Sequence, residues 1–177
     1  MSNRVFIATS LDGYIADKNG GLDWLHAVPN PDGLDMGYND FSNSIDAMVM
    51  GRNSFETVLG FDIDWPYNVP MFVLSNTLTR VPAGYEDKVF LVHGELSHVL
   101  KEINAKGFQE LYIDGGVTIQ SFLKEDLIDE MTITTMPILL GGGSPLFGNL
   151  ATPLNFSLES SVTFLDTIVQ NHFIRIR

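Results

Sequence analysis

Short apolar runs and helically spaced apolar positions alternate along this chain. Five runs have the length of buried strands and lie at residues 5–9, 47–50, 71–75, 89–93 and 111–114. Apolar residues recur at helical spacing over 36–45, from 53 onward, over 96–106 and over 117–124. Further strands are expected at 130–136 and at about 157–164 and 168–176.

This order of elements predicts the fold class. Strands that alternate with helices build a mostly parallel sheet with helices on both faces. The last two strands are joined by the short link Leu165–Thr167 and most simply form an antiparallel hairpin. We find no repeat, no low-complexity segment and no dividing linker. The prediction is therefore one α/β domain over residues 1–177, with a mixed sheet and a C-terminal antiparallel hairpin.

Two irregular segments interrupt the pattern. The Asp17–Gly33 loop is rich in Gly, Pro, Asp and Asn, yet it carries Leu22, Trp24 and Leu25. A long loop with apolar anchors is more often a functional lid than filler. The second segment, 137–147, contains three consecutive glycines that form either a phosphate nest or a flexible strand connection.

The turn after the second strand is the most informative stretch. Ala47–Met50 carries no charge, breaks at Gly51 and continues directly into a helix that begins with polar residues. The unpaired N–H groups and the dipole of such a helix start attract anions. Arg52 stands at this turn and is one of two cations between Lys18 and Lys88. The placement predicts a phosphate site.

Three strands end in Gly or small hydroxyl residues, at Gly51–Ser54, Ser75–Thr77 and Gly115–Thr118. Because ligands of open α/β sheets collect at the carboxyl ends of strands, the three turns together predict a bound dinucleotide. Each turn alone is equally a plain connection, and Arg52 is alternatively a surface residue paired with Glu56. Neither G-x-G-x-x-G nor a P-loop is present.

The charge balance narrows the range of partners. A formal net charge of −12 argues against nucleic acid and anionic membrane surfaces, since both require basic patches. One local cation and backbone amides still suffice for a small phosphorylated ligand. The sequence shows no signal peptide and no apolar segment long enough to span a membrane. We expect a cytoplasmic protein, which the absence of cysteine suits.

Residues for metal or acid–base chemistry stand out less clearly. The four histidines, at 26, 93, 98 and 172, show no metal-ligand spacing, so no metal site is predicted. Asp12, Asp35 and Asp40 lie near the Asp17–Gly33 loop and are candidate general acids, with Asp40 and Asp35 preferred. Each is alternatively a solvated surface carboxylate or a cap.

Five blocks of sequence resemble the dihydrofolate reductase superfamily, nearest to the reductase domain of riboflavin biosynthesis and its stand-alone bacterial relatives. Four of them are Ser10–Ala16, Val49–Arg52, Val73–Ser75 and Ile113–Val117. The fifth, Pro137–Phe147, is more typical of the riboflavin branch than of folate reductases. The order and spacing of the blocks carry the resemblance, which implies a dihydrofolate reductase-like fold.

The resemblance also implies NADPH as the cofactor and a role for each matched residue. Ala8 and Ile15 would offer backbone groups to the nicotinamide carboxamide, and Arg52 would bind the adenosine 2′-phosphate. The other implied cofactor-binding residues are Gly51, Asn53, Ser54, Leu74, Ser75, Ile113, Gly115, Gly116 and Val117. Riboflavin-type relatives further imply a homodimer through the sheet edge or the terminal strands.

Departures from the family pattern concern mainly the substrate. Folate reductases carry an Arg six residues before the Ser of the Leu-Ser block, where this chain has Val69. Their carboxylate on the first helix aligns near Gly37. A second Arg after the glycine turn is replaced by Val117, which weakens the preference for NADPH over NADH. A phosphoribosyl substrate would require cations near the Asp17–Gly33 loop, and Lys18 is the only one in this part of the sequence.

These observations predict an NAD(P)H-dependent oxidoreductase that delivers hydride to a small heterocyclic substrate. The two leading activities resemble 5-amino-6-(5-phosphoribosylamino)uracil reductase and dihydrofolate reductase, and an orphan reductase of the same fold is the third. Closure of the Asp17–Gly33 loop over the nicotinamide would exclude water. The alternative from a different class is a non-catalytic nucleotide-binding protein on the same fold.

Overall fold

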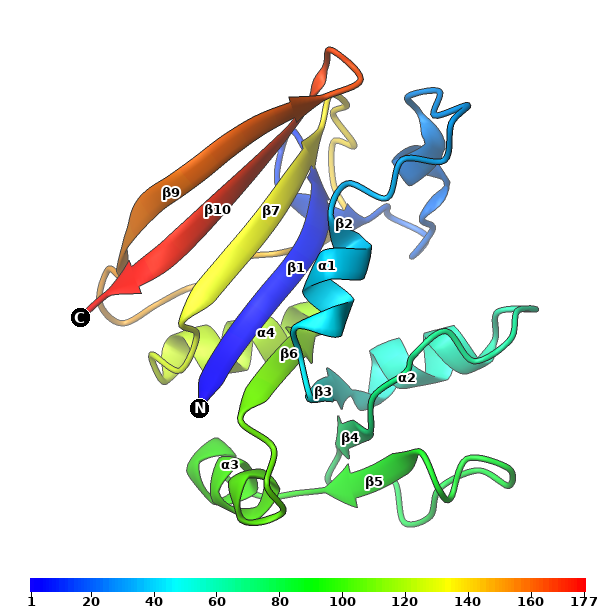
Figure 1. Cartoon of the computed structure of the whole chain (residues 1–177), viewed down its shortest axis with the longest axis vertical. Helices are drawn as coiled ribbons and strands as arrows, with labels where there is room; N and C mark the ends of the chain where they lie inside the picture. The colour runs from blue at the N-terminus through cyan, green and yellow to red at the C-terminus, as the bar shows by residue number, and fades with distance from the viewer.

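The computed structural model describes all residues, 1–177, and is built on one eight-stranded sheet (Figure 1). The strand order across this sheet is β5-β4-β3-β6-β1-β7-β10-β9. The strand bounds are β1 Ser2–Ser10, β3 Ala47–Gly51, β4 Met71–Leu74, β5 Val89–Val92, β6 Glu110–Asp114, β7 Glu130–Met136, β9 Asn155–Phe164 and β10 Ile168–Ile176. Two short strands, β2 (Tyr14–Ala16) and β8 (Ser144–Pro145), form a separate antiparallel pair.

The sheet is parallel except at one side. From β5 to β7 all neighbours run parallel, whereas β10 pairs antiparallel with both β7 and β9. Figure 1 shows this β9–β10 hairpin at the side of the sheet opposite β5. The predicted mixed, mostly parallel sheet with a C-terminal antiparallel hairpin is therefore confirmed.

Helices cover both faces of the sheet, as the alternation of side chains along its strands requires. Ala47 and Val49 of β3 pack in one core cluster with residues of α3 (Leu96–Ala105) and α4 (Gly116–Lys124). Met48 and Met50 point the other way and pack with Phe41 and Phe55, from α1 (Tyr38–Asn43) and α2 (Arg52–Leu59). The carboxyl ends of the parallel strands therefore open between two helical layers.

The helix predicted at 36–45 is shorter in the structure, where α1 spans Tyr38–Asn43. Met36 and Gly37 have positive φ values of 53° and 86°, a left-handed conformation that a right-handed helix does not contain. The chain therefore turns sharply before Tyr38, and this turn decides which residues of the segment face the sheet.

Two glycines let the turns after β3 and β6 approach each other closely. Gly115 has φ +93°, and a Cβ added to it would lie 2.6 Å from Ser54 Oγ. A Cβ added to Gly51 would lie 2.5 Å from Thr118 Oγ1. Real Cβ atoms do not approach other atoms so closely, so a side chain at either position would force the hydroxyl group of Ser54 or Thr118 to move.

We predict that Gly115→Ala destabilises the protein more than Gly13→Ala does. Both glycines have similar positive φ values, +93° and +86°, but nothing lies within 4 Å of a Cβ added to Gly13. Gly13→Ala should therefore cost only the left-handed strain of about 1–2 kcal/mol. Gly115→Ala should add a steric term of about 1–3 kcal/mol. Urea unfolding of both variants measures the difference, and equal costs would contradict the close approach of the two turns.

Candidate functional site

A large cavity opens at the carboxyl ends of β1, β3, β4 and β6. Its volume of about 910 Å³ is near the top of the range for ligand pockets. The lining residues come from these strand ends, from the first turns of α2 and α4, from the Asp17–Gly33 loop and from the glycine loop, residues 137–147. The strand ends predicted to meet at one edge thus surround one space.

Both helices that begin at this cavity start without a side-chain cap. Gly51 precedes α2 and Gly115 precedes α4, and neither residue carries a side chain that could accept the first backbone N–H groups. These N–H groups and the two helix dipoles favour negative charge at the same end of the cavity. The arrangement provides two adjacent sites for the phosphates of one ligand.

Arg52 links two of the predicted turns. Its Nη1 donates a hydrogen bond to Thr77 Oγ1 at 3.0 Å, and its Nη2 donates to Asn53 Oδ1 at 3.3 Å. The alternative pairing with Glu56 is present, but its two atoms lie 3.9 Å apart and both side chains are exposed. Such an exposed pair contributes little, so the guanidinium group is free to bind an anion at the cavity.

Most of the predicted cofactor-binding residues line this cavity: Ala8, Ile15, Gly51, Arg52, Asn53, Ser54, Leu74, Gly115, Gly116 and Val117. Ser75 and Ile113 do not. The Ser75 hydroxyl accepts N–H groups of Thr77 and Leu78, which shapes the turn after β4. Ile113 is fully buried in the core, because alternation along β6 points its side chain toward α3 and α4.

The preferred candidate acids, Asp35 and Asp40, lie on the surface outside the cavity lining. Asp35 accepts the backbone N–H groups of Gly37 and Asn39, and these bonds lower the pKa of its carboxyl group. Asp35 thus stabilises the turn before α1, where its ionised form is favoured. The helix directs Tyr38 and Phe41 toward the sheet, which leaves Asp40 in solvent.

Asp114, at the end of β6, is the carboxylate that the cavity contains. It is accessible through the cavity but otherwise surrounded by protein, and this burial raises its pKa to about 6, against the opposing effect of the Gly115 N–H. The sequence analysis did not select Asp114. Its position in the sequence could have identified it, because Asp114 stands between a predicted strand and a double-glycine turn. Ligands of open α/β sheets bind at such carboxyl ends of strands.

The charge of Asp114 acts on three tyrosines, Tyr38, Tyr67 and Tyr112. Burial, and then the Asp114 charge, raises the pKa of both Tyr38 and Tyr67, which therefore remain protonated. The Tyr112 hydroxyl donates a hydrogen bond to the Phe6 carbonyl at 2.9 Å. The cavity lining thus combines the two helix starts and Arg52 with Asp114, which directly precedes Gly115 at the start of α4, and with the neutral phenol of Tyr67. A weakly acidic carboxyl of this kind can hold and transfer a proton near neutral pH.

The Asp17–Gly33 loop borders the cavity with Gly20, Leu22 and Leu25. Its short helix η1 (Asp23–His26) carries Trp24, which is buried against Met136 and Ile168. Trp24 therefore anchors the middle of the loop to the sheet, as the apolar residues predicted. The segments on either side of this anchor form the wall of the cavity.

Asp12 fixes the glycine loop against the turn after β1. Its carboxylate accepts the backbone N–H groups of Leu140 at 3.0 Å and Gly141 at 2.8 Å. It also accepts the Ser10 hydroxyl at 2.6 Å, and these bonds, led by that of Ser10, lower its pKa to about 2. Two interpretations of this loop were open, a phosphate nest and a strand connection. The structure favours the connection, because amides of the loop already bind an internal anion.

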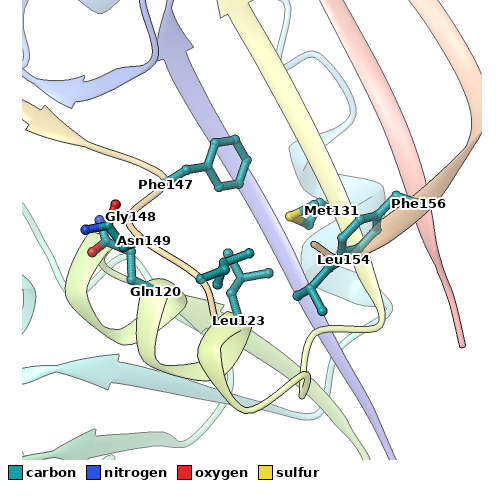
Figure 2. A pocket seen from close by; sticks show the side chains of 9 residues that line it. Gln120, Leu123, Met131, Phe147, Gly148, Asn149, Leu154 and Phe156 are labelled. Carbon is teal, nitrogen blue, oxygen red and sulfur yellow. The ribbon is translucent and has the colours of Figure 1, made fainter. Parts of the chain in front are cut away.

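A second hollow lies between α4, β7 and β9 (Figure 2). It has a volume of about 230 Å³, and its walls are formed mainly by apolar side chains, among them Leu123, Met131, Phe147, Leu154 and Phe156. No ionisable side chain lines it, so it offers no acid–base chemistry. No group of His, Cys, Asp or Glu side chains in the protein is placed to hold a metal ion. The structure also contains no helix with the length and hydropathy needed to cross a bilayer.

Comparison with known proteins places this geometry in a family. The family model of the RibD C-terminal domain matches residues 4–169. The uncharacterized protein YwjB of Bacillus subtilis is 33% identical over 174 residues, which cover 97% of this chain and 96% of YwjB.

Solved structures give the same result. A crystal structure described as a putative riboflavin biosynthesis protein from Shewanella sp. PV-4 is 63% identical and superposes with a TM-score of 0.98 over all of both chains. Dihydrofolate reductase from Enterococcus faecalis, in complex with NADP(H), shares the fold at 18% identity and a TM-score of 0.67, covering 99% of this chain and 97% of the enzyme. The chain belongs to the RibD C-terminal domain family.

Proposed function

We propose that the protein is an NADPH-dependent reductase that delivers hydride to a small heterocyclic substrate. The observation that carries the proposal is that two uncapped helix starts, Arg52 and Asp114 line one cavity. The helix starts and Arg52 suit a phosphorylated cofactor, and Asp114 suits a substrate that must gain a proton. The RibD C-terminal domain family, to which the chain belongs, supports this assignment.

The residues at the two helix starts fit a dinucleotide. Gly116 lies so close to Ile15 that a Cβ would come within 2.8 Å of Ile15 Cδ1, which leaves a glycine-floored cradle beside the start of α4. The N–H groups of α2 and α4 would bind the diphosphate, and Arg52 would bind the 2′-phosphate. Ala8 and Ile15 would position the nicotinamide ring, which supplies the hydride when the cofactor is bound. The related fold of dihydrofolate reductase holds NADP(H).

The protein's own contribution to the chemistry is a proton. Asp114 holds one up to about pH 6, and its charge acts on Tyr38 and Tyr67. A heterocycle that accepts hydride at carbon becomes more basic at an adjacent nitrogen, and a nearby carboxyl group can protonate it. Leu22 and Leu25 add apolar side chains to the lining of the same cavity. A carboxyl with this pKa favours catalysis over the alternative of a nucleotide-binding protein without turnover.

Arg52→Ala should weaken NADPH binding much more than NADH binding. Loss of a charge-assisted hydrogen bond to the 2′-phosphate corresponds to about 1–3 kcal/mol, while NADH lacks that phosphate. Isothermal titration calorimetry with both nucleotides measures the two changes. Arg80→Ala is the matched control, because it removes the same charge from an exposed residue outside the cavity. Equal losses for both nucleotides would show that Arg52 does not contact the 2′-phosphate.

Asp114→Asn should lower kcat by about 10²–10⁴-fold while the affinity for NADPH stays within a factor of about three. In the parent protein, kcat should fall as the pH rises through about 6, because only the protonated carboxyl donates. The Asn variant should lose this pH dependence. Steady-state rates of nicotinamide absorbance loss between pH 5 and 9 test both expectations.

Asp35→Asn and Asp40→Asn are the controls for this experiment, since both residues are exposed and lie outside the cavity. They should leave kcat and its pH profile unchanged. If either of them, rather than Asp114→Asn, abolished the pH dependence, the proton donor would be on the surface helix and the role of Asp114 would be refuted.

A further inference from the structure

Arg52 provides the one positive charge in the cavity lining. Among all residues that line the cavity, Arg52 and Asp114 are the only ones with an ionised side chain at neutral pH. Arg52 is the first residue of α2 and contacts Thr77 of the turn after β4. The rest of the lining, which includes Asp114, Tyr67 and residues of the Asp17–Gly33 loop, is therefore neutral or negative.

The other cations of the chain do not compensate for this. Arg4 lies near Glu130 and donates to Ser44, and Arg175 and Arg177 pair with Asp126 and Asp129. Lys18 is the cation of the Asp17–Gly33 loop, but its aliphatic stem lies across Gly142 and its side chain is not part of the lining. None of these groups is placed to neutralise a ligand next to Asp114.

The backbone amides of the glycine loop do not supply a second anion site. The N–H groups of Leu140 and Gly141 in the glycine loop donate to the carboxylate of Asp12. Gly143, which does line the cavity, packs directly on β2, since a Cβ added to it would lie 2.0 Å from the Ala16 carbonyl oxygen. The loop is filled by an internal anion whose charge repels a second one.

We propose that the substrate of this reductase is a nitrogen heterocycle that carries no phosphate group. This inference rests on the proposed function, which uses Arg52 and both helix starts for the cofactor. A substrate phosphate elsewhere in the cavity would lose its hydration without gaining a cation, and the carboxylate of Asp114 in the same lining would repel it. The specificity therefore differs from that of a reductase whose substrate is 5-amino-6-(5-phosphoribosylamino)uracil.

Calorimetry on the NADP⁺-saturated protein tests this with matched pairs of ligands. One pair is 5-amino-6-ribosylaminouracil and its 5′-phosphate, and the other is 6-hydroxymethylpterin and its phosphate. In at least one pair the phosphate-free compound should bind at least tenfold more tightly, a ratio that corresponds to about 1.4 kcal/mol. Tighter or equal binding of the phosphorylated members would overturn the inference, as would the absence of binding by all four compounds at millimolar concentration.

Lys18→Met provides the control variant, because Lys18 is the cation of the Asp17–Gly33 loop, which borders the cavity. The variant should leave the preference within each pair unchanged to within twofold. A selective loss of affinity for the phosphorylated compounds would show that Lys18 binds the phosphate and would refute the proposal.

Failure of the proposed function can be distinguished from failure of this inference. A preceding titration with NADP⁺ and NADPH shows whether the cofactor binds. If neither nucleotide binds, the reductase assignment fails, and the ranking of the same four ligands on the free protein still decides whether the cavity rejects phosphate.

Discussion

The close contact between two glycine turns determines the form of the whole site. Gly51 and Gly115 bring the ends of β3 and β6 so near to each other that an added Cβ would lie 2.5 Å from Thr118 Oγ1 or 2.6 Å from Ser54 Oγ. As a result, two helices begin side by side and point their unpaired N–H groups at one space. One helix start attracts a single phosphate, whereas two adjacent starts with Arg52 match a diphosphate and a further phosphate.

Charge is distributed unevenly within this acidic protein. With a net charge of −12, the chain places a single cation, Arg52, in a cavity lining that also holds Asp114. The same burial that raises the pKa of Asp114 to about 6 makes the lining around it unfavourable for a phosphate. Asp12 occupies the amides of Leu140 and Gly141, so these donors of the glycine loop are already used.

Local sequence patterns were sufficient to predict most of the elements and the glycine turns that line the cavity. The apolar periodicity of a strand or helix depends on which of its faces are buried. Consecutive residues such as Ala47–Met50 show this pattern directly. Glycine turns with polar first-turn residues are local as well, so Gly51–Ser54 and Gly115–Val117 could be recognised before the structure was known. The start of α1 was harder to predict, because no local sequence pattern indicates the left-handed conformation of Met36.

The sequence by itself determined the sheet, the order of the helices and the turns that meet at its edge. Only the tertiary structure decided which carboxylate serves the cavity, since this depends on packing between segments far apart in the chain. Asp114 is set apart from Asp35 and Asp40 by burial next to Tyr38 and Tyr67, not by its neighbours in sequence. Likewise, Asp12 binds amides 128 and 129 residues away, a contact that no local pattern encodes. Burial and proximity, which set the pKa and the available N–H groups, are properties of the folded chain.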